Sequence, residues 1–567
     1  MSVVGPSRCG FFLSRLRFSL LSRITCVTFG GQMSNLLNYI QPRLERKLGS
    51  WAHLHKCLQL KLFYESYCIG VMSYDSRSFD LGKIIGVGDK NDNRVQERSI
   101  LPLLNFFMVI YVNEIEKFSE IDGKYQNTRY IYLKIVIYKL KFGDSEERAR
   151  NVIQIDIRIK GALLSGRLDP QCYWYDGELL EMAADLASRL LPAFENSKTG
   201  LPHPRVNLRD GVPKNSRTDT CLAGAGTLLV EFGVLSRLIG DPVYEMSARR
   251  ANKVLWNLRN IKTGLFGHIV DVNSGKWLGD VSGVGAGADS FYEYLLKAYI
   301  LFGDHTDYIM FNETYSLIKQ YMRRGRSHCN SGYGDHPLYV NVDMKSGGTH
   351  TTWIDSLQAA FAGIQVLAGD IEEAICTHAL YYTIWKKYGV LPERFNWQRM
   401  SPDVSFYPLR PEFVEATYLL YQATKNPFYL HVGRDILTSL NNLTRVDCGY
   451  ATIHSVLDMT TEDRMESFFL AETCKYLFLL FDFDNPVNVQ SNKWVFSTEG
   501  HLIPMAPWLR EASNLWDHGP QDNPSKEAIA NSSRANCARI DEERTFGLPL
   551  KSQYLNQISS SFGVNFQ

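Results

Sequence analysis

From about residue 126 onward, the chain alternates between two kinds of apolar segment. One kind is apolar on nearly all sides, as in DSFYEYLLKAYILFG and ESFFLAETCKYLFLLF, and this is typical of a helix surrounded by protein. The other kind is amphipathic, as in YEMSARRANKVLWNLRN from Tyr244, and this is typical of a helix with one face in solvent. The alternation predicts a series of helical hairpins, each with an inner and an outer helix.

Short polar segments that stop helices separate these hairpins. They are built from Gly, Asp, Asn and Pro, which end a helix through a left-handed residue or because Pro cannot continue it. The stops lie at Asp144, Asp169, Asp241, Asp304, Asp370, Asn426 and Asn485. Most intervals hold about 55 to 75 residues, which is room for two helices and their loops, but the first is too short for a hairpin. Inner helices ringed by outer helices describe an all-α toroid, and seven stops predict an (α/α)7 barrel with its N-terminal hairpins incomplete or divergent.

The pattern divides the chain into three regions. Residues 1–125 show no such period and stay unassigned, although their first half is basic. Three arginines interrupt the apolar stretch FFLSRLRFSLLSRITCVTF, so it is a poor secretory signal and looks more like an amphipathic presequence or a mis-assembled start. Residues 126–500 form the predicted barrel, and residues 501–567 form a polar tail that begins by closing it. The longest apolar runs are shorter than the roughly 20 residues of a bilayer span, so no transmembrane helix is predicted.

Charge and cysteine usage exclude some classes of function. The chain has 61 Lys and Arg against 60 Asp and Glu, which argues against a nucleic-acid partner because such proteins carry a basic excess. Its 11 cysteines form no CxxC pair, and HExxH is absent, so nothing indicates zinc chemistry. Three N-x-S/T sequons begin at Asn312, Asn442 and Asn531, which fits a lumenal protein.

Carboxylates at the beginning of the predicted inner helices are the candidates for chemistry. A single carboxylate in a first turn is explained by the free N–H groups and the dipole of the helix. Inner helices of a toroid run parallel, however, so several such acids would line one mouth. There they could act as acid and base on an acetal or hold a hard cation such as Ca²⁺, next to aromatic rings that suit a sugar. The carboxylates are Asp289, Asp355, Glu412, Glu415 and Glu466.

Long ordered blocks of the sequence resemble glycoside hydrolase family 47. They include TDTCLAGAGTLLVEFGVLSRLIGD, GAGADSFYEYLLKAYILFGD, LPERFNWQ, FYPLRPEFVEATYLLYQATKNPFYLHVG, EDRMESFFLAETCKYLFLLFD and FSTEGH. Within the family the match is to the ER degradation-enhancing α-mannosidase-like proteins, whose C-terminal segment resembles CARIDEERTFGLPLKSQYLNQI. The resemblance covers about residues 126 to 567.

The resemblance implies an (α/α)7 barrel that binds Ca²⁺ and removes α1,2-linked mannose from Man-rich N-glycans with inversion. It also implies misfolded glycoproteins as substrates, ER oxidoreductases or chaperones as partners, and the ER lumen or its membrane surface as the location. By the same resemblance Asp289, Glu393 and Glu412 are catalytic, with Glu412 the general base. Glu415 and Glu466 bind sugar and calcium-bound water, Thr498 binds Ca²⁺ through its carbonyl and hydroxyl oxygens with Glu499 beside it, and Arg158 and Arg410 are the site arginines.

Two departures from the family pattern affect the expected activity. The family's general-acid glutamate stands in a block that reads IQIDIRIKGALLS here, which places Gln154 at that position. An amide cannot donate the proton of a carboxylic acid, and Asp156, two residues further on, is a poor substitute. The family's first helices are also not recognisable. Either the protein is a divergent copy that binds glycans as a lectin-like receptor, or the N-terminal third is a faulty gene model, in which case the product as given could be an incomplete, misfolded toroid.

Overall fold

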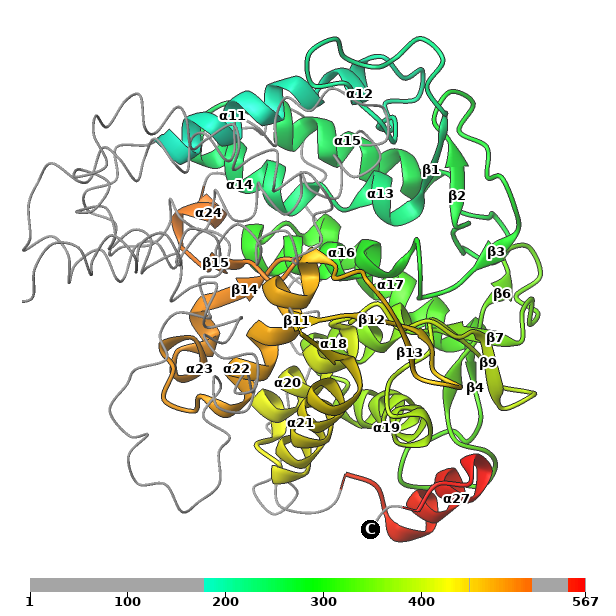
Figure 1. The fold of residues 1–567 in the computed structure, drawn as a ribbon. Helices are drawn as coiled ribbons and strands as arrows, with labels where there is room; N and C mark the ends of the chain where they lie inside the picture. Colours follow the sequence, from blue (N-terminus) through cyan, green and yellow to red (C-terminus); the bar gives the residue numbers. More distant parts are fainter. Residues whose placement is uncertain (1–177, 448, 512–548, 566–567) are drawn as a thin grey trace, which may run out of the picture.

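The computed structural model describes residues 178–447, 449–511 and 549–565, shown in colour in Figure 1. The predictions that concern residues 1–177, including Gln154 and Arg158, lie outside this part of the chain. The α-helices are α11 (Glu178–Leu190), α12 (Pro192–Glu195), α13 (Leu222–Gly226), α14 (Leu229–Ile239), α15 (Val243–Asn257), α16 (Asp289–Phe302), α17 (His305–Tyr321), α18 (Phe361–Leu367), α19 (Ile371–Tyr388), α20 (Glu412–Thr424), α21 (Pro427–Ser439), α22 (Lys475–Phe481), α23 (Pro486–Val489), α24 (Trp508–Glu511) and α27 (Ser552–Phe562). Short 3₁₀ or π helices are η1 (Leu357–Ala360), η2 (Leu440–Thr444), η3 (Phe469–Cys474) and η4 (Ser491–Lys493).

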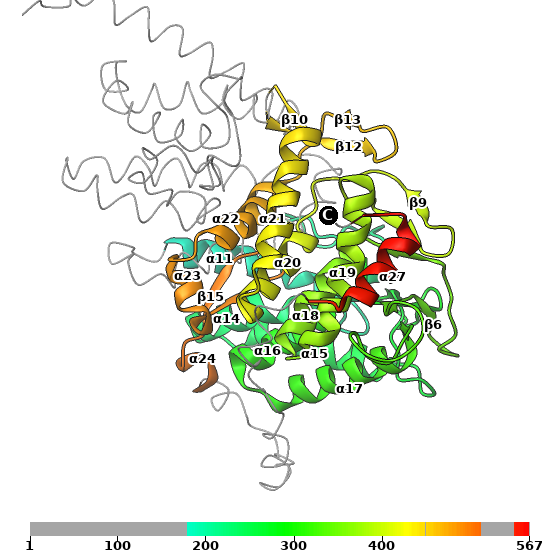
Figure 2. The ribbon, with the colours of Figure 1, turned by 90° about the horizontal axis from the view of Figure 1, so that it is seen from below.

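The helices pair in the order that the sequence predicts. In the described residues α14 packs on α15, α16 on α17, α18 on α19 and α20 on α21. The first members of these hairpins also contact one another in succession, from α14 through α16, α18 and α20 to α22. Figures 1 and 2 show these helices following one another around the molecule. The predicted inner and outer layers are therefore present in this part of the chain.

The five predicted stops that lie in the described residues, from Asp241 to Asn485, coincide with helix ends. Gly240 and Gly303 follow the last residues of α14 and α16 and have φ values of 75° and 76°, the left-handed conformation that favours glycine. Asp304 and Asn426 then begin the outer helices, since their side chains accept hydrogen bonds from the N–H groups of the second residues of α17 and α21 at 2.8 and 2.9 Å. One short polar segment thus ends one helix and begins the next.

Short antiparallel strands, which the sequence did not predict, occur between the helices. They have two to four residues each, too few for an alternating pattern to be recognised in the sequence. They are β1 (Asp219–Cys221), β2 (Ile269–Asp271), β3 (Val281–Ser282), β4 (Arg323–Arg324), β5 (Leu338–Tyr339), β6 (Val342–Asp343), β7 (Trp353–Asp355), β8 (Arg394–Asn396), β9 (Ser401–Val404), β10 (Arg445–Val446), β11 (Gly449–Tyr450), β12 (Thr452–Ser455), β13 (Thr460–Glu462), β14 (Trp494–Phe496) and β15 (Leu502–Pro504). The largest sheet has the order β7-β8-β9, with Asp355 opposite Arg394.

Two large apolar clusters hold the described residues together. One surrounds α14 and α16 and includes Phe232 and Phe291, and the other surrounds α19, α20 and α22. In the second cluster Trp385 stacks on Phe413 with ring centroids 5.6 Å apart. The stretch Leu222–Ile239, which includes α13 and α14, is long and apolar enough to cross a membrane, but 78% of it is buried inside the fold, as expected of core helices. It therefore gives only weak support for a membrane span.

The chain after residue 500, expected to be polar and loop-like, includes ordered elements in its described part. Strand β15 pairs with β14, and α27 packs along α19 (Figure 2).

A disulfide joins Cys329, in the connection between β4 and β5, to Cys376 in α19, 47 residues further on. No spacing motif in the sequence marked this pair.

Candidate active site

Three carboxylates at the beginning of successive inner helices form the centre of the site. Asp289 is the first residue of α16, Glu412 is the first residue of α20, and Asp355 ends β7 just before η1 leads into α18. The charges of Asp355 and Glu412 raise the pKa of Asp289, and the charge of Asp355 also raises the pKa of Glu412. The structure thus brings these three acids close enough for their charges to interact, although Asp355 ends a strand and does not lie in the first turn of a helix as expected.

Asp355 holds the segment that leads into α16. Its carboxylate accepts hydrogen bonds from the N–H groups of Ala286, at 3.2 Å, and Gln358, at 3.1 Å. A Cβ on Gly285 would lie 2.4 Å from an Asp355 oxygen, so only glycine allows this approach. The sequence counted Asp355 among the carboxylates that could line the mouth, but the family resemblance gave it no role. Its hydrogen bonds hold the segment that leads to Asp289.

The pKa values of these carboxylates are raised into the neutral range. Burial raises the pKa of Asp289 to about 8, although the hydrogen bond from the Ser290 N–H opposes this shift, and the charges of Asp355 and Glu412 raise the pKa further. Burial likewise raises the pKa of Glu412 to about 7, against the opposing effect of Arg410. Asp355 has a pKa of about 6, because burial outweighs its two backbone hydrogen bonds. The site therefore holds groups that exchange protons near neutral pH, as general acid–base catalysis needs.

Arg410 and Glu393 form a two-bond ion pair beside Glu412. Arg410 Nε donates to Glu393 Oε2 at 2.6 Å, and Nη2 donates to Oε1. Ser356 Oγ donates to the same carboxylate at 3.1 Å, so Glu393 is fixed from two sides. Arg410 Nη1 lies 3.8 Å from Glu412, whose buried Oε2 makes no hydrogen bond within the described part of the chain. Glu412 thus keeps one oxygen available for a ligand or a water.

Thr498 lies next to the beginning of α16. Its N–H donates to the Tyr294 hydroxyl at 3.2 Å, and its hydroxyl donates to Ser290 Oγ at 3.0 Å. The Tyr294 hydroxyl in turn donates to Glu231 at 2.6 Å. Two residues on, the Gly500 carbonyl accepts a hydrogen bond from Lys475 at 2.7 Å, and a Cβ on Gly500 would meet the Glu472 side chain at 3.0 Å.

The surroundings of Thr498 fit a hard cation. Glu231, Glu293 and Glu472 are buried there, and Glu415 has its pKa raised to about 8 by burial and by the charge of Glu293, with Lys297 opposing. The buried cations of this region are Lys297 and Lys475, fewer than the carboxylates. No three His, Cys, Asp or Glu side chains converge to hold a metal directly anywhere in the described ranges. An ion here would accordingly rest on the oxygens of Thr498, with the carboxylates acting through water.

Two other predicted residues make contacts with their neighbours in the chain. Glu466 pairs with Arg464 and is partly exposed. The Glu499 N–H donates to Ser497 Oγ at 3.3 Å, in the turn that follows Thr498. Gln154 and Arg158 are outside the described residues, so their predicted roles stay predictions. Glu231, Glu293 and Glu472 were not predicted, although a charge inside an otherwise apolar helix, as in LLVEFG, was the available signal.

The comparisons with known proteins identify the family. The family model described as "Glycosyl hydrolase family 47" matches residues 126–505, so the chain belongs to glycosyl hydrolase family 47. This confirms the resemblance found in the sequence. Among solved structures, the α-1,2-mannosidase from Trichoderma reesei is similar over 66% of this chain and 87% of its own, with a TM-score of 0.57 at 24% identity. That likeness supports the fold.

Relatives within the family indicate a subgroup. The chain is 45% identical over 362 residues to "Alpha-mannosidase I MNS5" of Arabidopsis thaliana, which covers 62% of this chain and 60% of the relative. It is 42% identical over 393 residues to "ER degradation-enhancing alpha-mannosidase-like protein 1" of Schizosaccharomyces pombe. This match covers 68% of this chain and 48% of the relative. It is also 42% identical over 373 residues to the human "ER degradation-enhancing alpha-mannosidase-like protein 3". This match covers 63% of this chain and 38% of the relative. The chain thus spans three fifths or less of these relatives.

Proposed function

We propose that the protein is an α1,2-mannosidase that trims Man-rich N-glycans on misfolded glycoproteins in the ER lumen and so marks them for degradation. The observation that carries the proposal is the cluster of Asp289, Asp355 and Glu412, whose pKa values of about 8, 6 and 7 suit proton transfer near neutral pH. Family membership supports the substrate class. The closed (α/α)7 barrel belongs to the same proposal, because the inner helices α14, α16, α18, α20 and α22 follow one another as such a ring requires.

The proposed reaction inverts the anomeric carbon in one displacement. Glu412, deprotonated, takes a proton from a water as that water attacks the anomeric carbon and the bond to the leaving oxygen breaks. Asp289 keeps its proton at pH 7 and supplies it to the leaving oxygen, directly or through a water. With this assignment the protein has a general acid even though Gln154 stands where the family has its general-acid glutamate. Glu393 and Arg410, fixed by their ion pair, would orient the sugar hydroxyls.

Calcium is part of the proposal. Thr498 would hold the ion through its carbonyl and hydroxyl oxygens, with Glu415, Glu466 and Glu499 on the bound waters. When bound, Ca²⁺ would coordinate sugar hydroxyls and act as a template for the ring. The excess of buried carboxylates around Thr498 supports a divalent ion there.

A second candidate is a lectin-like receptor of the same pathway that binds glycans without cleaving them. Gln154 favours it, because the family's acid is missing from that position. In this reading Asp289 does not replace the missing acid, and ER oxidoreductases or chaperones would be the partners that act after glycan binding.

Incubation of the purified full chain with a Man-rich N-glycan and CaCl₂ separates the two candidates. We expect mannose release that EDTA stops and CaCl₂ restores, with β-mannose as the first product seen by NMR. Glu412→Gln should abolish release, and Gln154→Glu should raise it. Glycan binding without release in the wild type, together with release by Gln154→Glu, would establish the lectin-like receptor instead.

A further inference from the structure

A C-terminal segment outside the family match is built into the folded body. The match ends at residue 505, yet residues 549–565 pack against the connection between β4 and β5 and against α19. In α27 the buried side chains are Tyr554, Ile558 and Phe562, spaced so that they share one face. We call residues 549–565 the strap.

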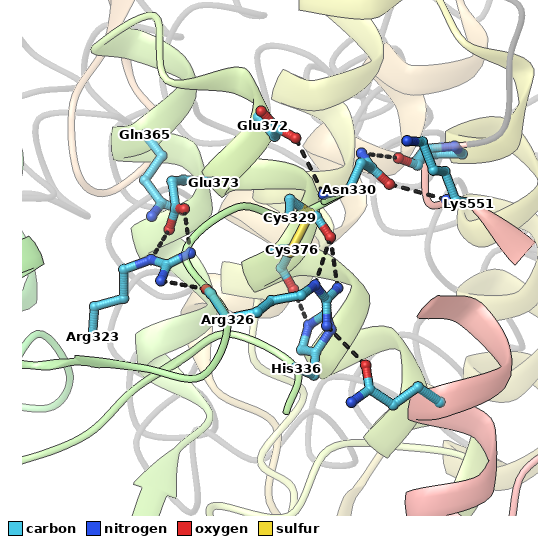
Figure 3. The surroundings of a disulfide bond; sticks show 12 residues. Arg323, Arg326, Cys329, Asn330, His336, Gln365, Glu372, Glu373, Cys376 and Lys551 are labelled. Atoms are coloured by element: carbon cyan, nitrogen blue, oxygen red, sulfur yellow. Dashed lines mark hydrogen bonds and ion pairs between the residues drawn. A yellow bond between two sulfur atoms is a disulfide. The ribbon is translucent and has the colours of Figure 1, made fainter. Parts of the chain in front are cut away.

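One end of the strap is attached beside the disulfide. The Asn330 side chain donates to the Pro549 carbonyl at 3.1 Å and accepts from the Lys551 N–H at 3.0 Å (Figure 3). Leu550 lies in one apolar cluster with Cys329 and Cys376. The disulfide therefore fixes the surface on which the strap begins.

The middle of the strap is held by Arg326. This buried guanidinium donates to the Cys329 carbonyl at 2.9 and 2.6 Å and to the Gln557 side chain at 2.8 Å. It also lies 3.9 Å from the centre of the Tyr554 ring, whose hydroxyl donates to the Gly332 carbonyl at 2.9 Å. A single arginine thus connects the disulfide loop with two successive turns of α27.

The other end of the strap contacts the strand that follows Glu393. Phe562 stacks on Phe395 of β8 with ring centroids 5.5 Å apart and an interplanar angle of 22°. Phe395 is 2% exposed and pairs with Ile354 of β7, next to the pair of Asp355 and Arg394. The Ser356 N–H also donates to the Glu393 carbonyl at 3.0 Å. Strand β8 thus lies between the strap and two carboxylates of the site.

We propose that the strap positions Glu393 by holding β8 in place, with Phe562 as the positioning residue. Removing the Phe562 ring leaves Phe395 without its stacking partner, so β8 and the ion pair of Glu393 with Arg410 lose their fixed position. The consequence for mannose release rests on the proposed function, whereas the mechanical link between strap and strand does not.

Hydrogen exchange tests the link without reference to activity. In Phe562→Ala, the amides of residues 393–396 should exchange about tenfold faster than in the wild type, since local opening becomes easier. The control is Phe311→Ala, which removes a buried ring that stacks on Tyr315 in α17, in the other apolar cluster. Phe562→Leu, which keeps an apolar contact with Phe395 but not the stacked ring, should accelerate this exchange less than Phe562→Ala does. Unchanged exchange at 393–396 in Phe562→Ala, or equal acceleration in Phe311→Ala, overturns the proposal.

Kinetics test the consequence for the site. At a temperature where both variants remain folded, Phe562→Ala should lower kcat/KM for mannose release by about tenfold or more, because small displacements of positioned groups are costly. Phe311→Ala, matched for loss of thermal stability, should leave it near the wild-type value. Equal losses in the two variants would mean that the strap is only stabilising. A wild type without mannose release rejects the proposed function instead, and the exchange experiment still decides the link.

The disulfide gives a further test of the same strap. Replacing both Cys329 and Cys376 by Ser should speed exchange in residues 552–562 and, through Phe562, in residues 393–396. Faster exchange in the strap with no change at 393–396 would contradict the link between them.

Discussion

Single residues of the site differ in what compensates their charge. Glu393 is neutralised by Arg410 through two hydrogen bonds, whereas no cation in the described residues pairs with Asp289. The sequence could predict that Asp289 and Glu412 begin inner helices, because that position follows from local pattern. It could not predict that Glu393 pairs with Arg410 or that Asp355 fixes Ala286, because these contacts join segments brought together only by the fold.

The pH dependence of mannose release follows from these pKa values. Activity needs Glu412 without its proton, so kcat/KM should rise with pH through about 7. It also needs Asp289 with its proton, so kcat/KM should fall again through about 8. The two groups influence each other, so the limbs report the pair rather than separate residues. A pH profile of kcat/KM measures both limbs.

Asp355→Asn tests whether Glu412 and Asp289 set the two limbs of this profile. It removes a negative charge that raises the pKa of both Glu412 and Asp289, while the amide keeps a hydrogen-bond acceptor. Both limbs should move to lower pH. Limbs that stay in place would show that other groups set the profile.

Among the elements, the helix stops were the features best predicted from sequence. Gly, Asp and Asn at these stops act locally, through a left-handed residue or a side-chain cap, so that no tertiary contact is needed to recognise them. The strands β7 and β8 were missed because three residues carry too little pattern. Their pairing places Glu393 near Asp355, so the missed elements matter more to the site than their length suggests.

The N-terminal cap of α21, formed by Asn426, allows a test of how much such a helix end contributes to stability. Asn426→Ala removes the acceptor for the Phe428 N–H and should lower the free energy of unfolding by about 1 kcal/mol. Asn426→Ser, which keeps a capping oxygen, should recover most of that loss. Urea denaturation followed by circular dichroism measures both, and an Ala variant as stable as the wild type would show that the cap contributes nothing.

At the scale of the whole molecule, the repeat of hairpins predicted the order of the helices but not the contacts that join distant parts of the chain. The disulfide and the strap both connect segments that no periodic pattern in the sequence relates. Cys329 forms its disulfide with Cys376 of α19, and Phe562 of the strap packs on Phe395 of β8, which is far away in the sequence. Such connections depend on the complementary shapes of surfaces that exist only after the hairpins have formed.

The disulfide should contribute strongly to global stability. Closing a loop with a sequence separation of 47 residues restricts the unfolded chain. Replacing Cys329 and Cys376 by Ala should therefore cost about 4 kcal/mol. In dithiothreitol the free energy of unfolding of the wild type should fall to that of the variant. The free energy of unfolding of the variant should not change when the reductant is added. A variant that is still destabilised by dithiothreitol would point to another disulfide.

The contact between Phe562 and Phe395 also has a consequence during translation. The two rings are far apart in the chain, so β8 leaves the ribosome well before the helix that covers it. At ordinary rates of synthesis the delay is roughly 10–30 s, which is long compared with the folding of a helical hairpin. Throughout that interval the Phe395 surface of the nascent chain stays uncovered. Completion of this part of the fold therefore waits for the ribosome to release α27.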